Sequence, residues 1–332
     1  MQSNNKSELR QDPVSGDWIV ISPGRAKRPR AIFAKIPKRK KSPKSVCPFE
    51  NPQKSGNPEP ILTYPGKQKW AIQVLENKYP AFTHSAKCGV ASKEGPHSVQ
   101  PGWGHHDLVI TAEHEKNFVH LPEEQANLVF QAFRDRYLML YNDKCLHYIS
   151  IFHNWGPAAG ASVYHPHYQI ISLPVVPPDV GHSLAGSARY WQEHKNCVHC
   201  AMIAWEQKEK KRIIYENDGA IALAPFVSRS PFEVRVFPKK HLSFFENTYD
   251  HDIASVVSAL QAVLKSFEKN LNDVDYNFFI HTAPLRDKEK YSHYHWHIEA
   301  YPKVSIRAGF ELGTGVDINV VDPNQAAKML RA

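Results

Sequence analysis

Two similar histidine motifs, one in each half of the chain, constrain the fold more than any other feature. The first, H-P-H-Y-Q, occupies residues 165–169, and the second, H-W-H-I-E, occupies residues 295–299. Laying one on the other pairs His165 with His295, His167 with His297, Gln169 with Glu299 and, upstream of the motifs, His114 with His241. Similar segments at matching places in two halves indicate an internal duplication. We therefore expect an α+β chain built from two related units.

Both halves show strands and one long helix ahead of the histidine motif. Apolar residues at helical spacing predict helices over 121–141 and 251–271, and a charged helix-like stretch covers 205–212. Apolar runs predict the strands, which are 18–21, 70–75, 107–111, 148–152, 167–171, 213–215, 220–224, 232–237 and 276–281. We expect two mainly antiparallel sheets with helices packed on them, one in residues 1–182 and the other in residues 183–332.

The stretch around the first motif is the best candidate for a site. Residues 152–171 pass from an apolar segment through a loop with Gly156 and Gly160 into H-P-H-Y-Q. Glycines allow close approach of the backbone, so the N–H groups of this loop can be expected to bind a phosphate. If the motif is extended, His167 and Gln169 point to the same face, because side chains alternate along a strand. This pattern indicates a compact polar site on an apolar strand.

Composition limits the class of protein and of ligand. A chain of 332 residues with 42% hydrophobic residues is long and apolar enough for a folded core. No apolar run approaches the ~20 residues of a membrane helix, and the polar N-terminus lacks a signal-peptide pattern. The net charge of +8 suits an anionic ligand. Much of it lies in the run from Lys35 to Lys44, which is typical of a mobile surface loop and alternatively of a nucleic-acid or targeting segment.

Cysteine and histidine spacing predicts metal binding. Cys197 and Cys200 form a C-x-x-C pair, which with His241 and His295 completes a Cys₂His₂ set suited to structural zinc; the alternative is two buried thiols beside surface histidines. The first half offers a matching set with one carboxylate: Cys47, Glu50, His114 and His165. Because carboxylate is a harder ligand, this site would be weaker or empty. The remaining cysteines, Cys88 and Cys145, are expected to be unpaired and buried, in a reducing cytoplasm.

Several long motifs carry a resemblance to a known family. They are DPVSGDWIVISPGRAKRP, ENKYPAF, HDLVI…EH, FHNWGPAAGASVYHPHYQ, the C-x-x-C pair and GFELGTG, which together span nearly the whole chain. The sequence resembles the galactose-1-phosphate uridylyltransferase family of the histidine-triad superfamily. The resemblance implies a duplicated histidine-triad-like fold, a homodimer and zinc. It implies His167 as nucleophile, His165 as zinc ligand and Gln169 at the phosphoryl group. Its remaining contacts with substrate would come from Arg25, Arg28, Asn77, Asn154, Gly160, Ser162 and Glu311.

Four departures from the family pattern bear on specificity. Glu50 replaces a zinc cysteine, Lys78 stands where an acid is common, and Tyr168 replaces a small residue inside H-P-H-x-Q. The glutamine expected after Glu311 is missing, and its place falls near Asp317. Together with the segments LPVVPP and IHTAPL, these departures make the sequence similar to the branch that includes plant ADP-glucose phosphorylase.

The resemblance implies a nucleotidyl transfer in two steps. A neutral imidazole can attack the α-phosphorus of a nucleotide sugar and form a nucleotidyl-histidine, which gives ping-pong kinetics. The expected reaction exchanges UMP between UDP-glucose and hexose 1-phosphate, with phosphorolysis of ADP-glucose as the alternative. Two other classes must be weighed. One is a nucleotide hydrolase that uses the alternating histidines 293, 295 and 297, and the other is a zinc-dependent nucleic-acid-binding protein.

Overall fold

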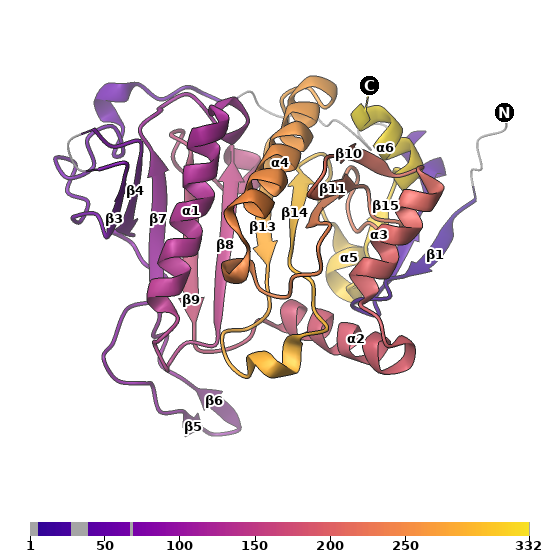
Figure 1. Cartoon of the computed structure of the whole chain (residues 1–332), viewed down its shortest axis with the longest axis horizontal. Helices are drawn as coiled ribbons and strands as arrows, with labels where there is room; N and C mark the ends of the chain where they lie inside the picture. The colour runs from indigo at the N-terminus through magenta and orange to yellow at the C-terminus, as the bar shows by residue number, and fades with distance from the viewer. Residues whose placement is uncertain (1–5, 28–38, 67–68, 332) are drawn as a thin grey trace.

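One ten-stranded sheet forms the centre of the protein (Figure 1). The computed structural model describes residues 6–27, 39–66 and 69–331. Every pair of neighbouring strands in this sheet is antiparallel. The strands in order are β10 (Ile213–Glu216), β11 (Ala220–Leu223), β12 (Val234–Pro238), β14 (His297–Pro302), β13 (Tyr276–His281), β8 (Tyr148–Trp155), β9 (His167–Leu173), β7 (His105–Thr111), β4 (Ile72–Glu76) and β3 (Leu62–Tyr64). The predicted α+β class with antiparallel strands is confirmed.

The two halves of the sequence meet in the middle of this sheet, where β8 pairs with β13. Asn154 lies opposite Asn277, and Phe152 lies opposite Phe279. The two expected sheets are thus joined edge to edge in one, which removes two strand edges with unpaired backbone groups. The expected boundary after residue 182 falls inside α2 (Pro178–His194). The division into two units stays a prediction.

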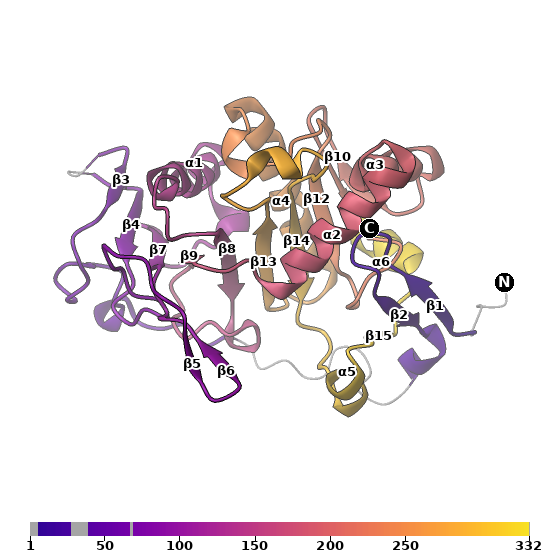
Figure 2. The same cartoon turned by 90° about the horizontal axis from the view of Figure 1, so that it is seen from below.

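Two long helices, α1 (Glu123–Leu140) and α4 (Asp250–Asn270), cover one face of the sheet (Figure 2). The main core lies between them and the sheet. On β9, Tyr168 and Ile170 belong to this core. Because side chains alternate along a strand, His167 and Gln169 point to the opposite face. That face carries the candidate site.

Smaller elements lie beside the C-terminal half of the sheet, away from α1 and α4 (Figure 2). They are α5 (Gly309–Thr314) and a three-stranded sheet of β1 (Glu8–Gln11), β2 (Trp18–Ile21) and β15 (Ile318–Asn319). β15 pairs with β2 in parallel, so the two ends of the chain meet there. The site face is therefore covered unevenly along the sheet.

The predicted long helices are confirmed, but several elements escaped prediction. The stretch 205–212 overlaps the end of α3 (Val198–Glu209). The elements missed are the helices α2, α5 and α6 (Pro323–Arg331), the strands β1, β3, β14 and β15, and the hairpin of β5 (Ser92–Glu94) and β6 (His97–Val99). Glycines obscure the helical pattern of α2, and Gly186 is needed there because a Cβ would lie 1.6 Å from the Val14 carbonyl oxygen. Among the described residues, no helix is long and apolar enough to cross a membrane.

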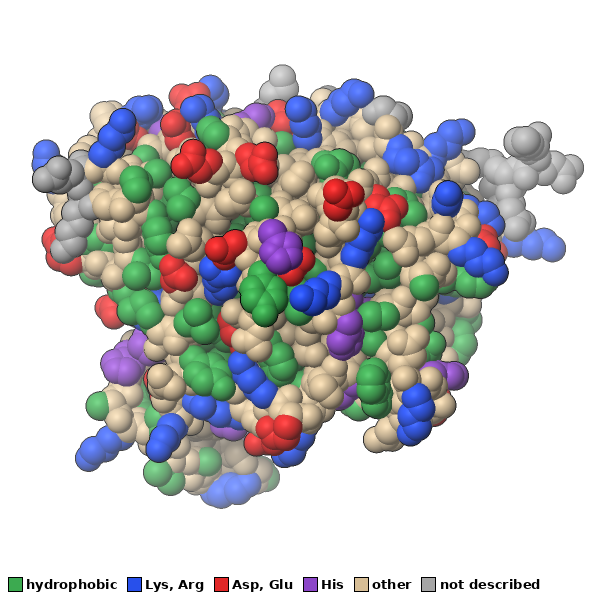
Figure 3. All heavy atoms as spheres, in the orientation of Figure 1, with side chains coloured by type: hydrophobic (Ala, Val, Ile, Leu, Met, Phe, Trp, Pro, Cys, Tyr) green, Lys and Arg blue, Asp and Glu red, His purple; other side chains and the backbone are tan. Residues whose placement is uncertain are grey.

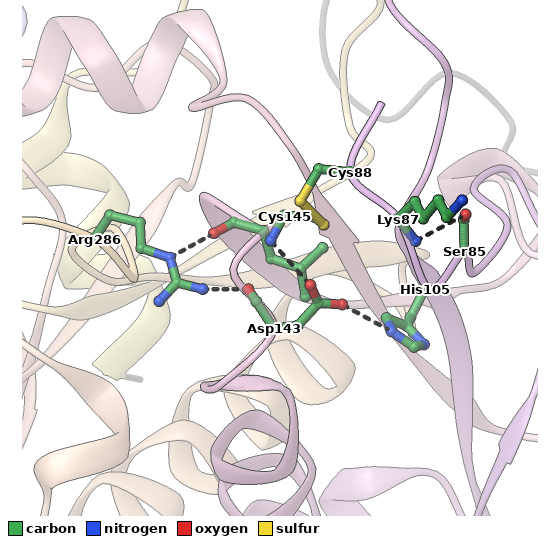
Figure 4. The surroundings of a disulfide bond; sticks show 8 residues. Ser85, Lys87, Cys88, His105, Asp143, Cys145 and Arg286 are labelled. Atoms are coloured by element: carbon green, nitrogen blue, oxygen red, sulfur yellow. Dashed lines mark hydrogen bonds and ion pairs between the residues drawn. A yellow bond between two sulfur atoms is a disulfide. The ribbon is translucent and has the colours of Figure 1, made fainter. Parts of the chain in front are cut away.

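The expectation for Cys88 and Cys145 is wrong, because the two form a disulfide bond (Figure 4). Cys88 is exposed and Cys145 is half-buried. The bond ties the segment before β5 to the loop after α1, where Asp143 Oδ1 accepts a hydrogen bond of 2.9 Å from the Cys145 N–H. Sequence reasoning could not foresee this pairing, since it depends on two distant loops meeting. Disulfides persist mainly in oxidising surroundings, which weighs against the expected reducing compartment.

The basic run is held to the protein surface wherever it is described. Residues 35–38 lie outside the described residues. Arg39 stacks over the Trp155 ring, with its guanidinium carbon 4.7 Å from the ring centroid, and pairs with Asp275 at 2.5 Å. Lys41 pairs with Glu115 at 2.7 Å. Residues 39–43 form neither helix nor strand, as expected of a surface loop, and the mobility of this loop stays a prediction.

Candidate active site

His167 begins strand β9 and is held as a neutral imidazole with a defined tautomer. Its Nδ1–H donates a hydrogen bond of 2.9 Å to the carbonyl oxygen of His165. Burial lowers its pKa, so the ring is uncharged near neutral pH. With the proton on Nδ1, the lone pair lies on Nε2. The Phe49 ring packs 5.3 Å from the imidazole centroid and limits its rotation. His167 therefore has the state required of a nucleophile.

Gln169 lies two residues further along β9, on the same face. Its Oε1 is 2.9 Å from Nε2 of His106, a residue of β7. His106 Nε2 is also 3.1 Å from Nδ2 of Asn77, which follows β4. His106 thus lies between Gln169 and Asn77, and the substrate contacts of these two residues stay predictions. Sequence reasoning missed His106 because it began that strand at residue 107; the strand alternation of residues 106, 108 and 110 was the available signal.

The loop between β8 and β9 is fixed by a close contact with the C-terminal half. Gly156 has φ 85°, and a Cβ there would lie 2.0 Å from Asp275 Oδ1. Asp275 Oδ2 accepts a hydrogen bond of 2.8 Å from the Ala158 N–H. The N–H groups of residues 159–161 donate to carbonyls of the loop itself. These four donors are engaged within the protein, so the expected phosphate cradle is reduced to the N–H groups of residues 162–164.

Three other predicted contact residues lie in this loop or beside it. Gly160 has φ 89°, and its Cβ position is 3.9 Å from Asn154 Nδ2. Asn154 Oδ1 accepts a hydrogen bond of 2.7 Å from Asn277. Ser162 is exposed at the far end of the loop. The structure therefore places all three along the path from the strands to His167.

A cavity of about 580 Å³ extends from Asn154 across the C-terminal half of the sheet. Glu311 and Asp317 line its far part. Glu311 Oε2 accepts a hydrogen bond of 3.0 Å from the Ala308 N–H, and Asp317 Oδ1 lies 2.9 Å from Nε of Arg307. Glu311 thus shares a cavity with Asn154, and its contact with the substrate stays a prediction.

Of the two predicted arginines, the structure describes Arg25, which lies away from His167. Arg25 lies in a 3₁₀ turn (Pro23–Lys27) directly after β2, in the region of the three-stranded sheet. Figure 1 shows β1 and β15 of that sheet far from β7 and β9. Arg28 lies outside the described residues. For Arg25 to contact a substrate at His167, a second chain must supply it.

Two of the four departures take on a structural meaning. Tyr168 is fully buried on the helix side of β9, with its ring 4.6 Å from that of His153. It is a core residue and leaves the site face unchanged. Lys78 is exposed beside Asn77, with its Nζ 6.0 Å from the Tyr79 ring centroid.

The second half contains the predicted set of four metal-type donors. Cys197, Cys200, His241 and His295 place their ligand atoms within 4.8 Å of one another. His241 and His295 donate Nε2–H to the carbonyls of Ser292 and Pro238, at 2.8 and 2.9 Å, which leaves each Nδ1 with its lone pair. Those Nδ1 atoms lie 3.4 and 3.5 Å from Cys200 Sγ. The hydrogen bond from the Cys200 thiol lowers the pKa of Cys197, which favours the thiolate that binds zinc.

The first half repeats this arrangement around Cys47. His165 and His114 donate Nε2–H to the carbonyls of Thr111 and Ser42, at 2.7 and 2.8 Å. Their Nδ1 atoms and Cys47 Sγ lie within 4.8 Å of one another. Glu50 completes the set, because its Oε2 is 3.6 Å from His114 Nδ1. Both of those atoms are buried and lack a hydrogen-bond partner, which fits a cation between them.

The second motif does not form an equivalent nucleophile. His297 donates Nδ1–H to the His295 carbonyl at 3.1 Å, as His167 does to His165. Its Nε2, however, faces Glu299 Oε1 at 3.5 Å, and the same carboxylate oxygen is paired with Arg235 at 2.9 Å. This ion pair occupies the position where a phosphoryl group would have to bind.

The alternating histidines of the second motif also serve different purposes. His293 Nε2 is directed to the Leu184 carbonyl at 3.4 Å, and His295 belongs to the donor set. A triad converging on one phosphate, as the hydrolase alternative requires, is not formed by these described residues.

Comparison with known proteins agrees with the fold. The family model described as galactose-1-phosphate uridyl transferase, N-terminal domain, matches residues 1–177, and a second model, described as a domain of unknown function (DUF4921), matches residues 104–332. An ADP-glucose phosphorylase of Arabidopsis thaliana is 35% identical, over 99% of this chain and 93% of its own. The chain belongs to the galactose-1-phosphate uridyl transferase family. It is an enzyme of the nucleotidyltransferase type.

Other relatives come from both branches of this family. A galactose-1-phosphate uridylyltransferase of Thermotoga maritima is 26% identical over 98% of each chain. A crystal structure of an ADP-glucose phosphorylase from Arabidopsis thaliana with bound ADP-glucose has a TM-score of 0.84 and 32% identity, covering 98% of this chain and 99% of that one. A structure of a uridylyltransferase has a TM-score of 0.74 and 27% identity, with coverage of 98% and 97%.

Proposed function

We propose that the protein transfers a nucleotidyl group from a nucleotide sugar through a covalent intermediate on His167. The observation that carries this proposal is the hydrogen bond from His167 Nδ1–H to the His165 carbonyl, which presents Nε2 as the attacking atom. Nε2 would form a bond to the α-phosphorus while the bond from that phosphorus to the sugar phosphate oxygen breaks. A second phosphate oxygen then takes the nucleotidyl group from the histidine, which regenerates the enzyme.

Charge on the phosphoryl oxygens would be stabilised by donors on the site face. Gln169 lies beside His167, and the N–H groups of residues 162–164 lie at the end of the loop. Electrostatic stabilisation of this kind is the larger part of phosphoryl-transfer catalysis. Asn77 and Asn154 border the two sides of the site and would bind the nucleotide.

The first candidate reaction takes ADP-glucose as the donor and phosphate as the acceptor. The 35% identical relative and the structural neighbour with a TM-score of 0.84 are both ADP-glucose phosphorylases. The second candidate is exchange of UMP between UDP-glucose and hexose 1-phosphate, because several relatives are galactose-1-phosphate uridylyltransferases over most of the chain. Both reactions use the same nucleophile.

Zinc would be bound at both donor sets and would supply folding free energy rather than contact with substrate. At the first site it would hold His165, whose carbonyl orients His167. A homodimer would also be needed if Arg25 contacts the substrate, because a single chain keeps Arg25 at the three-stranded sheet.

The nucleic-acid-binding alternative has little support from the described surface. Arg39 and Lys41 are paired with acids in the described part of the basic run. On the face shown in Figure 3, Lys and Arg are interspersed with Asp and Glu and form no continuous stripe. Nucleic-acid binding usually requires a clustered basic surface.

One incubation distinguishes the two donors. The protein is mixed separately with ADP-glucose and UDP-glucose, each labelled at the α-phosphate, and the denatured protein is assayed for covalent label. We expect label from ADP-glucose at a higher rate than from UDP-glucose. Label from UDP-glucose alone would select the uridylyl reaction, and no label from either donor would refute the proposed function.

A further inference from the structure

We propose that His106 is a positioning residue that fixes the side-chain amide of Gln169 for phosphoryl transfer. This inference rests on the proposed function for its catalytic consequence. The hydrogen bonds on which it depends are features of the structure alone. They begin with the tautomer of His106, which its two ring contacts determine.

The first ring contact sets the proton of His106 on Nε2. The backbone N–H of Ala81 donates a hydrogen bond of 3.0 Å to His106 Nδ1. An N–H group can only donate, so Nδ1 must carry a lone pair. In a neutral imidazole the proton then lies on Nε2. His106 is 9% exposed, so water has little access to alter this assignment.

The second ring contact transmits that choice to Gln169. His106 Nε2–H lies 2.9 Å from Gln169 Oε1 and donates to it. An amide oxygen that accepts this bond directs the NH₂ group of Gln169 the other way. Within the described residues, that NH₂ group has no acceptor. A pair of donors on the same face as His167, with no protein acceptor, is what a phosphoryl oxygen requires.

The side-chain amide of Asn77 also lies against His106. Asn77 Oδ1 accepts a hydrogen bond of 3.0 Å from the Tyr79 N–H, so its Nδ2 is the donor end of the amide. Nδ2 lies 3.1 Å from His106 Nε2, which is also a donor. Because the Nε2 proton of His106 is directed to Gln169, this contact sets two donors against each other, and the NH₂ group of Asn77 is left for a ligand. His106 thus separates the phosphoryl end of the site from the nucleotide end.

The backbone holds His106 rigidly enough for this role. Its carbonyl accepts a hydrogen bond of 2.8 Å from the Asn77 N–H, which closes the base of the long excursion between β4 and β7. Without the Nε2–H donor, the Gln169 amide could rotate by half a turn and present its oxygen to the phosphoryl group. An oxygen there would repel the charge that the amide donors should stabilise.

Two substitutions at His106 test the roles of its two ring nitrogens separately. His106→Asn keeps an acceptor near the Nδ1 position for the Ala81 N–H but loses the donor to Gln169. His106→Gln keeps a donor near the Nε2 position. We expect His106→Asn to lower kcat for nucleotidyl transfer by about 10- to 100-fold, with a much smaller change in KM. His106→Gln should recover most of this loss, and His97→Asn, an exposed histidine of β6, should change neither.

A double-mutant cycle tests whether His106 acts through Gln169. In a Gln169→Ala background, His106→Asn should cost less than about threefold, because the group it positions is gone. Full multiplicativity of the two losses would overturn the proposal. Equal loss in His106→Asn and His106→Gln would also overturn it, since a merely structural role does not distinguish the two variants.

A spectroscopic readout decides the hydrogen bond without reference to activity. Nitrogen-15 NMR of wild-type protein should show a neutral His106 protonated at Nε2. The Gln169 side-chain NH₂ resonances, assigned with Gln169→Glu, should shift in His106→Asn and stay near their wild-type positions in His106→Gln. An Nδ1-protonated ring would refute the positioning role even if the proposed function holds. Failure of the proposed function would appear separately, as wild-type protein that forms no labelled intermediate.

Discussion

The Nδ1–H of His167 donates a hydrogen bond of 2.9 Å to the carbonyl oxygen of His165, whose own ring faces Cys47 in the first donor set. The residue that would bind metal and the residue that would attack phosphorus are therefore linked through one backbone carbonyl. A metal on His165 would act on catalysis by orienting His167, at a distance from the substrate. This linkage explains why the expected metal ligand, His165, and the expected nucleophile, His167, are separated by a single residue in H-P-H-Y-Q.

His167→Ala should abolish nucleotidyl transfer and leave the fold intact. The loss should appear in kcat and amount to several orders of magnitude, as for other nucleophile deletions. The wild type should acquire an acid-labile, base-stable label from the nucleotide sugar, and the variant should not. Far-ultraviolet circular dichroism and thermal melting provide the control for folding. A variant that retains a tenth or more of the wild-type activity would exclude His167 from this role.

Metal removal should affect stability more than the turnover of molecules that remain folded. Cys200→Ser breaks the closed donor set of the second half, so we expect the free energy of unfolding to fall by about 2–5 kcal/mol. Elemental analysis should find two zinc ions per chain in the wild type and one in the variant. His97→Ala, at an exposed position of β6, is the matched control. Wild-type protein that was never exposed to chelator and contains no metal would contradict this prediction.

The members of the first donor set, Glu50 included, could be predicted from the sequence. The duplication predicted that Cys47, Glu50, His114 and His165 would meet, and the contacts agree. What the sequence could not provide was the lone-pair direction of each histidine, because that depends on distant backbone carbonyls such as those of Thr111 and Ser42. The position of Arg25 could not be predicted either. The sequence pattern assigns it to phosphate, but the fold places it in the turn after β2.

Other differences have equally local causes. The merging of the two half-sheets depends on β8 meeting β13, and no residue pattern specifies an edge-to-edge pairing between halves. Tyr168 departs from the family pattern inside the site motif, but strand alternation directs its side chain into the core. The tautomer of His106 could not be foreseen, because it depends on the Ala81 N–H, which lies 25 residues earlier in the chain.

His153 should make the protein less stable as the pH falls. Burial lowers its pKa to about 3, whereas an unfolded chain has a histidine pKa of about 6.5. Between these values the unfolded chain binds one more proton at this residue than the folded chain. The free energy of unfolding should then fall by about 1.4 kcal/mol per pH unit for this residue, and its contribution should be fully recovered above pH 6.5.

Urea denaturation of His153→Gln and wild type, from pH 7.5 to pH 4.5, measures this contribution. The variant should be less stable at pH 7.5, and the difference should shrink as the pH falls. His97→Gln, at an exposed position, should give a curve parallel to that of the wild type. Parallel curves for His153→Gln as well would show that His153 is not buried as a neutral ring.

The choice of acceptor should be governed by the far part of the cavity, where two acids could bind a sugar. Asp317 stands near the place of the missing glutamine, yet its carboxylate is already engaged by Arg307 at 2.9 Å and lies 3.8 Å from Arg229. One oxygen of Glu311 is used by the Ala308 N–H. A site selects a sugar hydroxyl strongly only when a dedicated polar group would be left unpaired without it.

Galactose 1-phosphate and glucose 1-phosphate should therefore be used with kcat/KM values within about tenfold of each other, since about 1.4 kcal/mol separates one decade. Inorganic phosphate needs no sugar contacts and should compete well for the nucleotidyl-enzyme. The measurement is kcat/KM for all three acceptors with ADP-glucose and with UDP-glucose as donor, repeated in Glu311→Gln. Phosphate should be the best acceptor with ADP-glucose, and the kcat/KM for phosphate should not change in Glu311→Gln. A galactose preference well above tenfold would show that Asp317 or Glu311 replaces the lost glutamine and would assign the chain to uridylyl exchange.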